Sequence, residues 1–496
     1  GFKKLIKDGF FSKNTHYNYV PTYTGPGHAS IYAGSTPEMH GIIANDWYSR
    51  KLNRRMNCVD DSTVTTVGAK SGGKSSYSPV NLLSSNFGDE LKIGSQGESK
   101  VVGVSLKNRG AILPAGHIPD GAYWFDDQSG NFVTSTYYTK KLPDWVEAFN
   151  DKKLAKQYLT GTWETLKPIE EYKESGPDDN PYEAVIGMNS RPVFPYDLTK
   201  IRKKNGNYSF IRKAPFGNTI VADMAKAAIE GENLGKDESI DLLAISFSST
   251  DYIGHAFGPD SKELEDTYIR LDRDIANLIE YLDENVGKDE YVLFITADHA
   301  VAEVPQFLID KRVPAGYIQS APIKSILGRK LGEKYGKEKW ILNTSNDQIF
   351  LDNDLLKKKK IDRNEFLNDI RETLLTFQGI KNVYKAEDMV THTYTDGIRE
   401  KLQNGYNTKR SGDLLIQYEP GWFQTGYGKT GTTHGSGYNY DTHVPLIIYG
   451  TGIPKGYISA KRTNITDIIP TLCIKYGVNL PNGATGTPIL ELFKQY

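Results

Sequence analysis

The sequence has little cysteine, no long hydrophobic run and no excess of either charge. Its 496 residues include two cysteines, Cys58 and Cys473, which are too few for a disulfide framework or a thiolate zinc site but leave one disulfide open. The longest apolar runs, such as residues 444–450, are far shorter than the ~20 residues of a membrane-spanning helix. With 60 basic and 61 acidic side chains, the chain also lacks the basic excess of general nucleic-acid binders. We therefore expect neither a membrane span nor a nucleic-acid partner.

The chain does contain short apolar, β-branched runs that alternate with helical patterns, which is typical of an α/β protein. Such runs predict strands at residues 101–106, 241–247, 291–296 and 444–450. Their nearly continuous hydrophobicity fits strands covered on both faces, so we expect a mostly parallel central sheet flanked by helices. Apolar residues at alternating steps of four and three over residues 264–282 predict an amphipathic helix between the second and third strands.

Two regions interrupt this alternation and are interpreted as insertions. Residues 305–430 are rich in lysine, with a run of four at 357–360 that we expect at a solvated loop or helix end, and are expected to form a cap. Residues 111–215 are rich in tyrosine and turn signals and form the second expected insertion. The α/β core is then expected in the three remaining segments, residues 1–110, 216–304 and 431–496.

Ionisable side chains gather at the ends of all four predicted strands, where open α/β sheets bind their ligands. They are Lys107 and Arg109 after the first strand, Asp251 and His255 after the second, Asp298 and His299 after the third, and His434 and His443 before the fourth. Aspartate and histidine without cysteine suit zinc in catalytic sites that keep an open position. Each residue alone also fits a helix cap or local packing, but the coincidence of the whole set favours a metal site.

The N-terminal segment offers a candidate nucleophile, Thr24, in the sequence Thr-Gly-Pro-Gly-His before an apolar helical pattern. A helix that begins there would present backbone N–H groups to an anion. A threonine hydroxyl attacks poorly at neutral pH unless a base or a metal lowers its effective pKa. The motif alone fits a nucleophile and a capping threonine in a Gly/Pro turn equally well.

Residues 68–75 match the phosphate-loop pattern G-x-x-x-x-G-K-[ST] in every position. That loop functions only between a buried strand and a helix whose amides surround the phosphates. The segment before it is short and polar, and Pro79 follows within four residues. We therefore interpret residues 68–75 as a Gly/Ser/Lys loop without a phosphate-binding role.

The motifs together resemble the alkaline phosphatase superfamily of two-zinc phosphotransferases. They are most similar to the periplasmic phosphate-irrepressible alkaline phosphatases that use threonine as nucleophile. The resemblance covers nearly the whole chain and rests on TGPGHASIYAG, GIIANDW, SLKNRGAILPAGH, SSTDYIGHAFGPDS, ITADHA, GTTHGSGYNYDTHVPLI and ITDIIPTLCIKYG, in the family's order. It implies hydrolysis of small phosphate monoesters through a phosphothreonine intermediate at a site with two zinc ions.

The resemblance also implies a role for individual residues. These are Thr24 as the nucleophile, Asn45, Lys107 and Arg109 as ligands of the phosphoryl oxygens, Asp251, His255 and His434 around the zinc facing the leaving group, and Asp298 and His299 around the zinc facing the nucleophile. His434 is preferred to His443 because the family ligand lies in a His-Gly turn. His443 is expected to pack at the start of the fourth strand.

Further expectations concern the chain end and the setting of the protein. In the family, an aspartate at the end of a strand upstream of the nucleophile completes one zinc site, and here Asp8 is the only carboxylate before Thr24. We therefore expect the natural chain to extend upstream, with that strand and a signal peptide. The protein is expected to be periplasmic or secreted and monomeric.

The alternatives are other uses of the same scaffold. A nucleotide pyrophosphatase or phosphodiesterase of the superfamily would have the same zinc ligands, but Lys107 and Arg109 favour a monoester because it carries one more negative charge than a diester. A sulfatase is disfavoured because no Cys/Ser-x-Pro-x-Arg segment occurs near the N-terminus. A binding protein without catalytic activity would be distinguished by the lack of turnover when zinc is bound.

Overall fold

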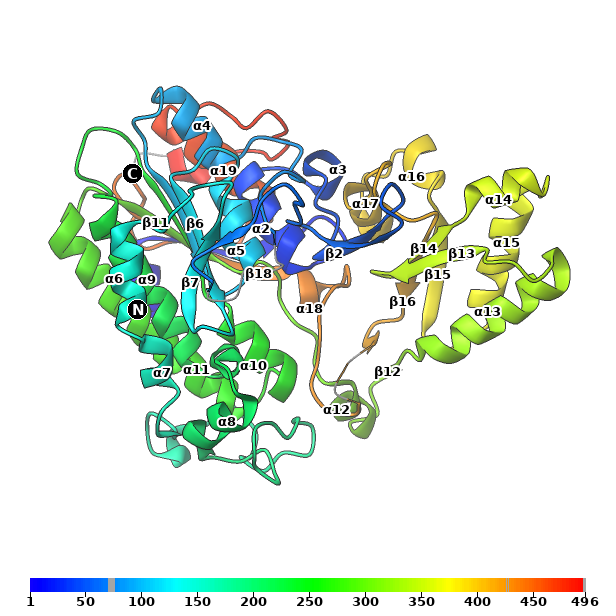
Figure 1. Cartoon of the computed structure of the whole chain (residues 1–496), viewed down its shortest axis with the longest axis horizontal. Helices are drawn as coiled ribbons and strands as arrows, with labels where there is room; N and C mark the ends of the chain where they lie inside the picture. The colour runs from blue at the N-terminus through cyan, green and yellow to red at the C-terminus, as the bar shows by residue number, and fades with distance from the viewer. Residues whose placement is uncertain (70–75, 425, 427, 494–496) are drawn as a thin grey trace.

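The computed structural model describes residues 1–69, 76–424, 426 and 428–493. Strands and helices alternate along most of the chain, and the expected α/β class is confirmed (Figure 1). All four predicted strands are present, and the predicted amphipathic helix is α11 (Lys262–Leu282), which buries Leu271 and Ile275 among other apolar residues. No helix in the described part of the chain is both long enough and apolar enough to cross a membrane.

The main body contains two five-stranded sheets. The first has the order β11 (Val292–Thr296), β18 (His443–Gly450), β1 (Phe10–His16) and β19 (Tyr457–Ser459), with β20 (Thr463–Asn464) also paired to β1. The second has the order β10 (Leu242–Ser246), β5 (Val101–Ser105), β6 (Gly121–Asp126), β7 (Asn131–Ser135) and β4 (Thr66–Val67).

Strand directions in these sheets are more mixed than the hydrophobic runs predict. β10, β5 and β6 are parallel, as expected, whereas β18 runs antiparallel to both β1 and β11. A continuous apolar run reports burial on both faces and carries no information about strand direction. The antiparallel β18 has a direct consequence for the site, because its first residues lie at the edge where β11 ends.

Helices cover both faces of β5, which explains its apolar sequence. Val101 belongs to a core cluster with residues of α2 (Thr24–Ala33), α5 (Asn108–Ala115) and α19 (Ile468–Tyr476). Val102 and Val104 belong to a second cluster, with residues of α9 (Phe216–Gly231) and α10 (Ser249–Phe257). The helices that follow β5 and β10 are thereby fixed against the sheet at the ends where the predicted site residues lie.

The expected insertion at residues 111–215 is not a separate unit. β6 and β7 fall within this range, yet they pair with β5 and with each other in the second sheet. Trp163 and Tyr196 from the same range are buried in the cluster that contains Val102. The frequent turn signals in the sequence made this range look like an insertion, although its short strands and aromatic residues belong to the main core.

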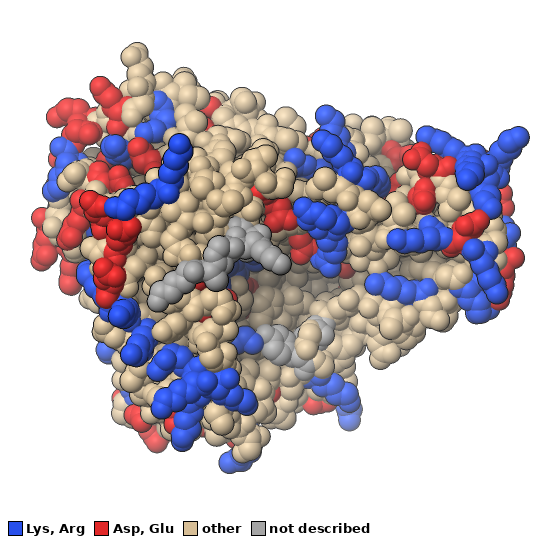
Figure 2. Space-filling model, in the orientation of Figure 1, with Lys and Arg blue, Asp and Glu red and all other residues tan. Residues whose placement is uncertain are grey.

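Part of the range 305–430 forms a lobe with its own sheet and core, seen at the right of Figure 1. Its strands are, in sheet order, β13 (Ile341–Ser345), β14 (Gln348–Leu351), β16 (Leu414–Tyr418) and β15 (Ile380–Lys385), and its helices are α13 (Ser320–Tyr335), α14 (Asn353–Lys358) and α15 (Arg363–Leu374). The lysine run 357–360 is exposed at the end of α14, and acidic and basic side chains mix over the lobe (Figure 2). The surface is hollowed between the lobe and the main body (Figure 2).

Candidate active site

Thr24 is the first residue of α2, and its side chain is not used as a helix cap. The N-cap position is Tyr23, which makes no side-chain capping hydrogen bond. Thr24 is 1% exposed, and its Oγ1 lies 3.3 Å from the Nζ of Lys107. The capping role that the motif left open is therefore not the one that Thr24 has in the structure.

Asn45 lies beside the same helix terminus and is oriented by it. Its Oδ1 accepts a hydrogen bond from the backbone N–H of Gly25 at 2.7 Å. Because the oxygen is engaged with the backbone, the Nδ2 amide is the group left to donate to an anion near Thr24. The lobe that contains β13 and β14 contacts the residue after Asn45 as well. Asn346, between these two strands, donates a hydrogen bond from its Nδ2 to the carbonyl oxygen of Asp46 at 2.7 Å.

Lys107 and Arg109 bring positive charge to Thr24 from the end of β5. Lys107 is the N-cap residue of α5 and is 5% exposed, and its Nζ lies 2.5 Å from Asp251 Oδ2. Arg109 is half-buried, and its Nε makes no hydrogen bond within the described residues. Two cations in a largely buried position favour binding of an anion.

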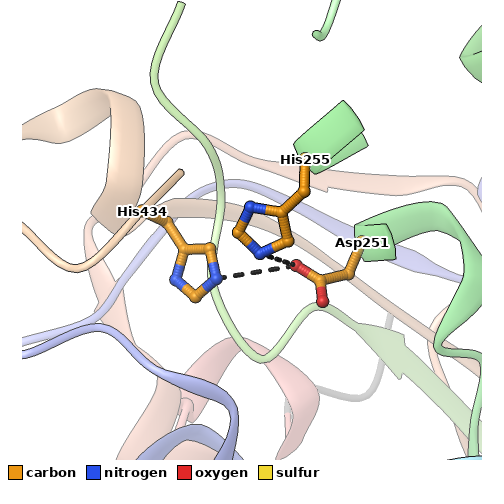
Figure 3. A group of neighbouring side chains, drawn as sticks. All are labelled: Asp251, His255 and His434. Atoms are coloured by element: carbon orange, nitrogen blue, oxygen red, sulfur yellow. Dashed lines mark ion pairs between the residues drawn. The ribbon is translucent and has the colours of Figure 1, made fainter. Parts of the chain in front are cut away.

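Asp251, His255 and His434 converge on one point (Figure 3). Asp251 and His255 lie one turn apart on α10, and His434 comes from the loop before β18. Asp251 Oδ1 is 3.2 Å from His255 Nε2 and 3.5 Å from His434 Nε2. Among the described residues, this is the group of three or more His, Cys, Asp or Glu whose ligand atoms all lie within 4.8 Å of one another.

Asp298 and His299, after β11, adjoin this group. His299 Nε2 is 3.8 Å from Asp251 Oδ1 and 3.6 Å from Asp298 Oδ2. The rings of His299 and His434 stack with their centroids 3.4 Å apart. His299 Nε2 is buried and has no hydrogen-bond partner in the described part of the chain.

The three histidines share one mode of anchoring. Their Nδ1 atoms each contact a backbone carbonyl oxygen: His255 contacts Thr432 at 2.8 Å, His434 contacts Thr22 at 2.7 Å, and His299 contacts Ala300 at 3.0 Å. A proton on Nδ1 that is held by a carbonyl leaves Nε2 as the lone-pair atom, which is the arrangement of metal-binding histidines. Sequence reasoning could not have found these carbonyls, because tertiary packing brings them to the rings.

The electrostatics favour deprotonated carboxylates in the group. Burial alone would raise the pKa of Asp251, but Lys107 and His255 outweigh it and hold the pKa well below its usual value. Burial also opposes ionisation of Asp298, and the nearby His299 and His28 again lower its pKa. Both carboxylates are therefore available as anionic ligands at neutral pH.

Two residues that the sequence analysis did not single out also support the site. The ring of His28 bridges two groups. Its Nδ1 lies 2.9 Å from the carbonyl oxygen of Thr24, and its Nε2 lies 3.0 Å from the Oγ of Ser246. Asp441 Oδ2 accepts hydrogen bonds from the backbone N–H groups of the two residues after His434. Both lie within motifs of the sequence: His28 ends Thr-Gly-Pro-Gly-His, and Asp441 lies two residues before the start of β18.

The other predictions from the motifs have mixed outcomes. His443 begins β18, is exposed and stacks on His16 at 4.7 Å, so the choice of His434 for the ligand group agrees with the geometry. Cys58 and Cys473 are both buried and free, so they do not pair with each other. Most of the phosphate-loop match at 68–75 lies outside the described residues.

The comparisons with known proteins agree with this geometry. The sequence profile described as type I phosphodiesterase / nucleotide pyrophosphatase matches residues 1–439. The chain belongs to this family. The chain is 42% identical to alkaline phosphatase PafA of Elizabethkingia meningoseptica over 99% of this chain and 89% of that protein. It is also 42% identical to a protein of Myroides odoratus named calcium-transporting ATPase, over 100% of this chain and 90% of that protein.

Two solved structures match the fold closely. Wild-type PafA matches with a TM-score of 0.95 and 41% identity, covering 99% of this chain and 93% of that one. A PafA variant with four substitutions matches with a TM-score of 0.94 and 40% identity over the same shares of both chains. The substituted residues of that variant are a threonine, an asparagine, a lysine and an arginine, in the order and at the intervals of Thr24, Asn45, Lys107 and Arg109.

Proposed function

We propose that this chain is an alkaline phosphatase that hydrolyses small phosphate monoesters through a phosphothreonine intermediate at a two-zinc site. The observation that carries the proposal is the convergence of a buried hydroxyl, two cations and an Asp/His cluster at the ends of three strands. Thr24 Oγ1 and the cluster are joined by one side chain, Lys107, whose Nζ contacts both Thr24 and Asp251. The names of the 42% identical PafA and of its solved structures support the same activity.

The residues present fit zinc as the resident metal. Carboxylate and imidazole ligands without sulfur are borderline-hard, and zinc in catalytic sites commonly uses them with one position left open. Asp251, His255 and His434 would hold one ion, and Asp298 and His299 would contribute to the second. The Nε2 atom of His299 is buried and has no hydrogen-bond partner among the described residues, so its lone pair is available to a metal ion.

The chain's own groups position the phosphoryl group. When bound, zinc would supply Lewis-acid stabilisation of the attacking and departing oxygens. Thr24 attacks phosphorus in line, the alcohol leaves, and water then cleaves the phosphothreonine from the opposite side. Asn45 Nδ2, Lys107 Nζ and the Arg109 guanidinium hold the non-bridging oxygens, where charge stabilisation supplies most of the catalysis of phosphoryl transfer.

The second candidate function is a phosphodiesterase, which the description of the family profile favours. The discriminating feature is the pair Lys107 and Arg109, because a monoester presents two negative charges to them and a diester presents one. The PafA variant substituted at a matching set of four residues supports their placement in the site. We therefore place the chain with the monoesterases.

One experiment tests the function directly. The zinc-loaded protein should turn over 4-nitrophenyl phosphate much faster than its methyl diester, and elemental analysis should find two zinc ions per chain. Faster turnover of the diester would instead favour a phosphodiesterase, and no turnover with zinc bound would indicate a binding protein. We further propose that the protein acts as a monomer in the periplasm or outside the cell.

A further inference from the structure

A second cluster of buried acidic side chains lies outside the candidate active site, between segment 178–183 and the start of α11. Glu183 is 2% exposed, and Glu263 is fully buried in the first turn of α11. Glu263 Oε1 accepts a hydrogen bond from the hydroxyl of Tyr196 at 2.6 Å. The three remaining oxygens, both of Glu183 and Oε2 of Glu263, have no hydrogen-bond partner among the described residues.

The two carboxyl groups act on each other and have no cation to pair with. Burial and then the charge of Glu263 raise the pKa of Glu183 to about 10. Burial raises the pKa of Glu263 to about 8, and Asp178 acts on both groups in the same direction. Within the described residues, neither Glu183 nor Glu263 forms an ion pair with a lysine or arginine. Without a bound cation, both groups therefore keep their protons at neutral pH, and a cation beside them would be needed to ionise them.

A buried anionic oxygen without a partner is strongly destabilised, so such groups bind protons or a cation. Protons would neutralise both groups, but both oxygens of Glu183 and Oε2 of Glu263 would still have no partner outside the pair among the described residues. A divalent cation would engage all three oxygens.

We propose that Glu183 and Glu263 bind a calcium ion. All the available ligand atoms are carboxylate oxygens, which suit a hard cation and not zinc. Calcium accepts bidentate carboxylates, and backbone carbonyls or water complete its coordination, whereas magnesium usually keeps several waters that a fully buried pair of carboxylates does not accommodate well. Asp178, which raises the pKa of both groups, is itself half-buried.

The position of this site gives the ion a structural role that goes beyond the proposed function. The neighbours of Glu183 in the chain bond to both sides of the metal-ligand region. Ala184 N–H donates to the carbonyl oxygen of Ala256 at 2.9 Å, and the carbonyl oxygen of Tyr182 accepts from Gly431 N–H at 2.9 Å. A cation at Glu183 would therefore fix the segment that braces α10 next to His255.

Elemental analysis of the zinc-loaded, full chain dialysed against about 1 mM calcium tests the proposal. We expect one calcium per chain in the wild type and none in Glu183→Gln or Glu263→Gln, with the zinc content unchanged. Glu280→Gln is the matched control, because Glu280 is exposed on the same helix, α11, and this variant should keep its calcium. Calcium should also raise the Tm of the wild type and of Glu280→Gln only.

A second measurement needs no variant. Terbium commonly replaces calcium, and a terbium ion next to Glu263 would lie close to Tyr196, so excitation of tyrosine should give terbium luminescence that added calcium removes. Wild-type protein that binds no calcium at about 1 mM and shows neither a Tm shift nor this luminescence would overturn the proposal. Retention of calcium by Glu183→Gln would overturn it as well. Zinc content and monoester turnover, measured on the same samples, report separately on the proposed phosphatase.

Discussion

The Nζ atom of Lys107 lies 3.3 Å from the Oγ1 of Thr24. Both residues are buried, at 5% and 1% exposure, so solvent screens their interaction little. The same Nζ contacts Asp251, which links the hydroxyl to the Asp/His cluster through a single side chain. A change at any of these three positions should therefore disturb the other two.

Thr24→Ala should lower monoesterase activity by a factor on the order of 10³ or more, because it removes the proposed nucleophile. Zinc and phosphate should still bind, since the proposed ligands come from other elements. Steady-state turnover, elemental analysis and trapping of labelled phosphate on the protein measure this. Thr24→Ser is the control and should keep part of the activity, whereas labelled phosphate trapped on a residue other than Thr24 would refute the assignment.

Lys107→Ala and Arg109→Ala should each slow monoester turnover by about 10²–10³-fold, as the loss of one donor to a developing charge commonly does. Diester turnover should fall much less, because the diester presents one negative charge fewer. The ratio of kcat/KM for the two substrates measures the effect. Equal losses on both substrates would mean that these residues serve uniform binding or stability.

Asp441 should matter through His434 and not through contact with substrate. Its Oδ2 accepts hydrogen bonds from the backbone N–H groups of Gly435 and Ser436, the two residues after His434. Asp441→Ala should therefore weaken zinc binding by about 10–100-fold, the usual effect of losing such support.

The zinc dependence of activity distinguishes this role. Excess zinc should restore the kcat of Asp441→Ala, and Asp441→Asn should bind zinc more tightly than Asp441→Ala because its amide oxygen can still accept one hydrogen bond. A kcat that stays low at saturating zinc would place Asp441 in a different role.

The sequence predicted the parts of this site that follow strands directly. Apolar runs of strand length located β5, β10 and β11. Lys107 and Asp251 follow two neighbouring parallel strands of one sheet, so they could be expected together. Asp298 follows β11, which belongs to the other sheet, so its position beside them could not be derived from strand ends. His434 was predicted from its place before the fourth strand and from the resemblance to a family. It reaches this edge because β18 runs antiparallel to β11, a direction that the sequence did not indicate.

The remaining features depend on contacts distant in sequence. The carbonyl of Thr22 reaches His434 only after folding, and no local pattern encodes it. The same holds for β6 and β7, whose short runs resemble a turn-rich insertion until they pair with β5. The orientation of Asn45 depends on the start of α2, so only the resemblance to a family could assign it a role.

Acid should inactivate the enzyme by releasing metal, with His255 protonating before His434. Burial alone would lower the pKa of His255, but Asp251 outweighs it and the pKa is raised above its usual value. Burial and His299 lower the pKa of His434 to about 3, so that ring stays neutral in mild acid. Protons thus compete with metal at His255 as the pH falls, and activity should be highest in alkaline solution.

The raised pKa of His255 also determines how the stability of the protein changes with pH. In the metal-free protein, the raised pKa of His255 contributes stability that is fully present below its unfolded pKa of about 6.5 and is lost as the pH rises through the folded pKa. Metal binding becomes stronger over the same pH range, because a smaller fraction of His255 carries a proton that the metal must displace. The difference in Tm between zinc-loaded and chelated protein should therefore widen from about pH 5 to about pH 8. A constant difference, or activity that survives exhaustive chelation, would contradict the metal site.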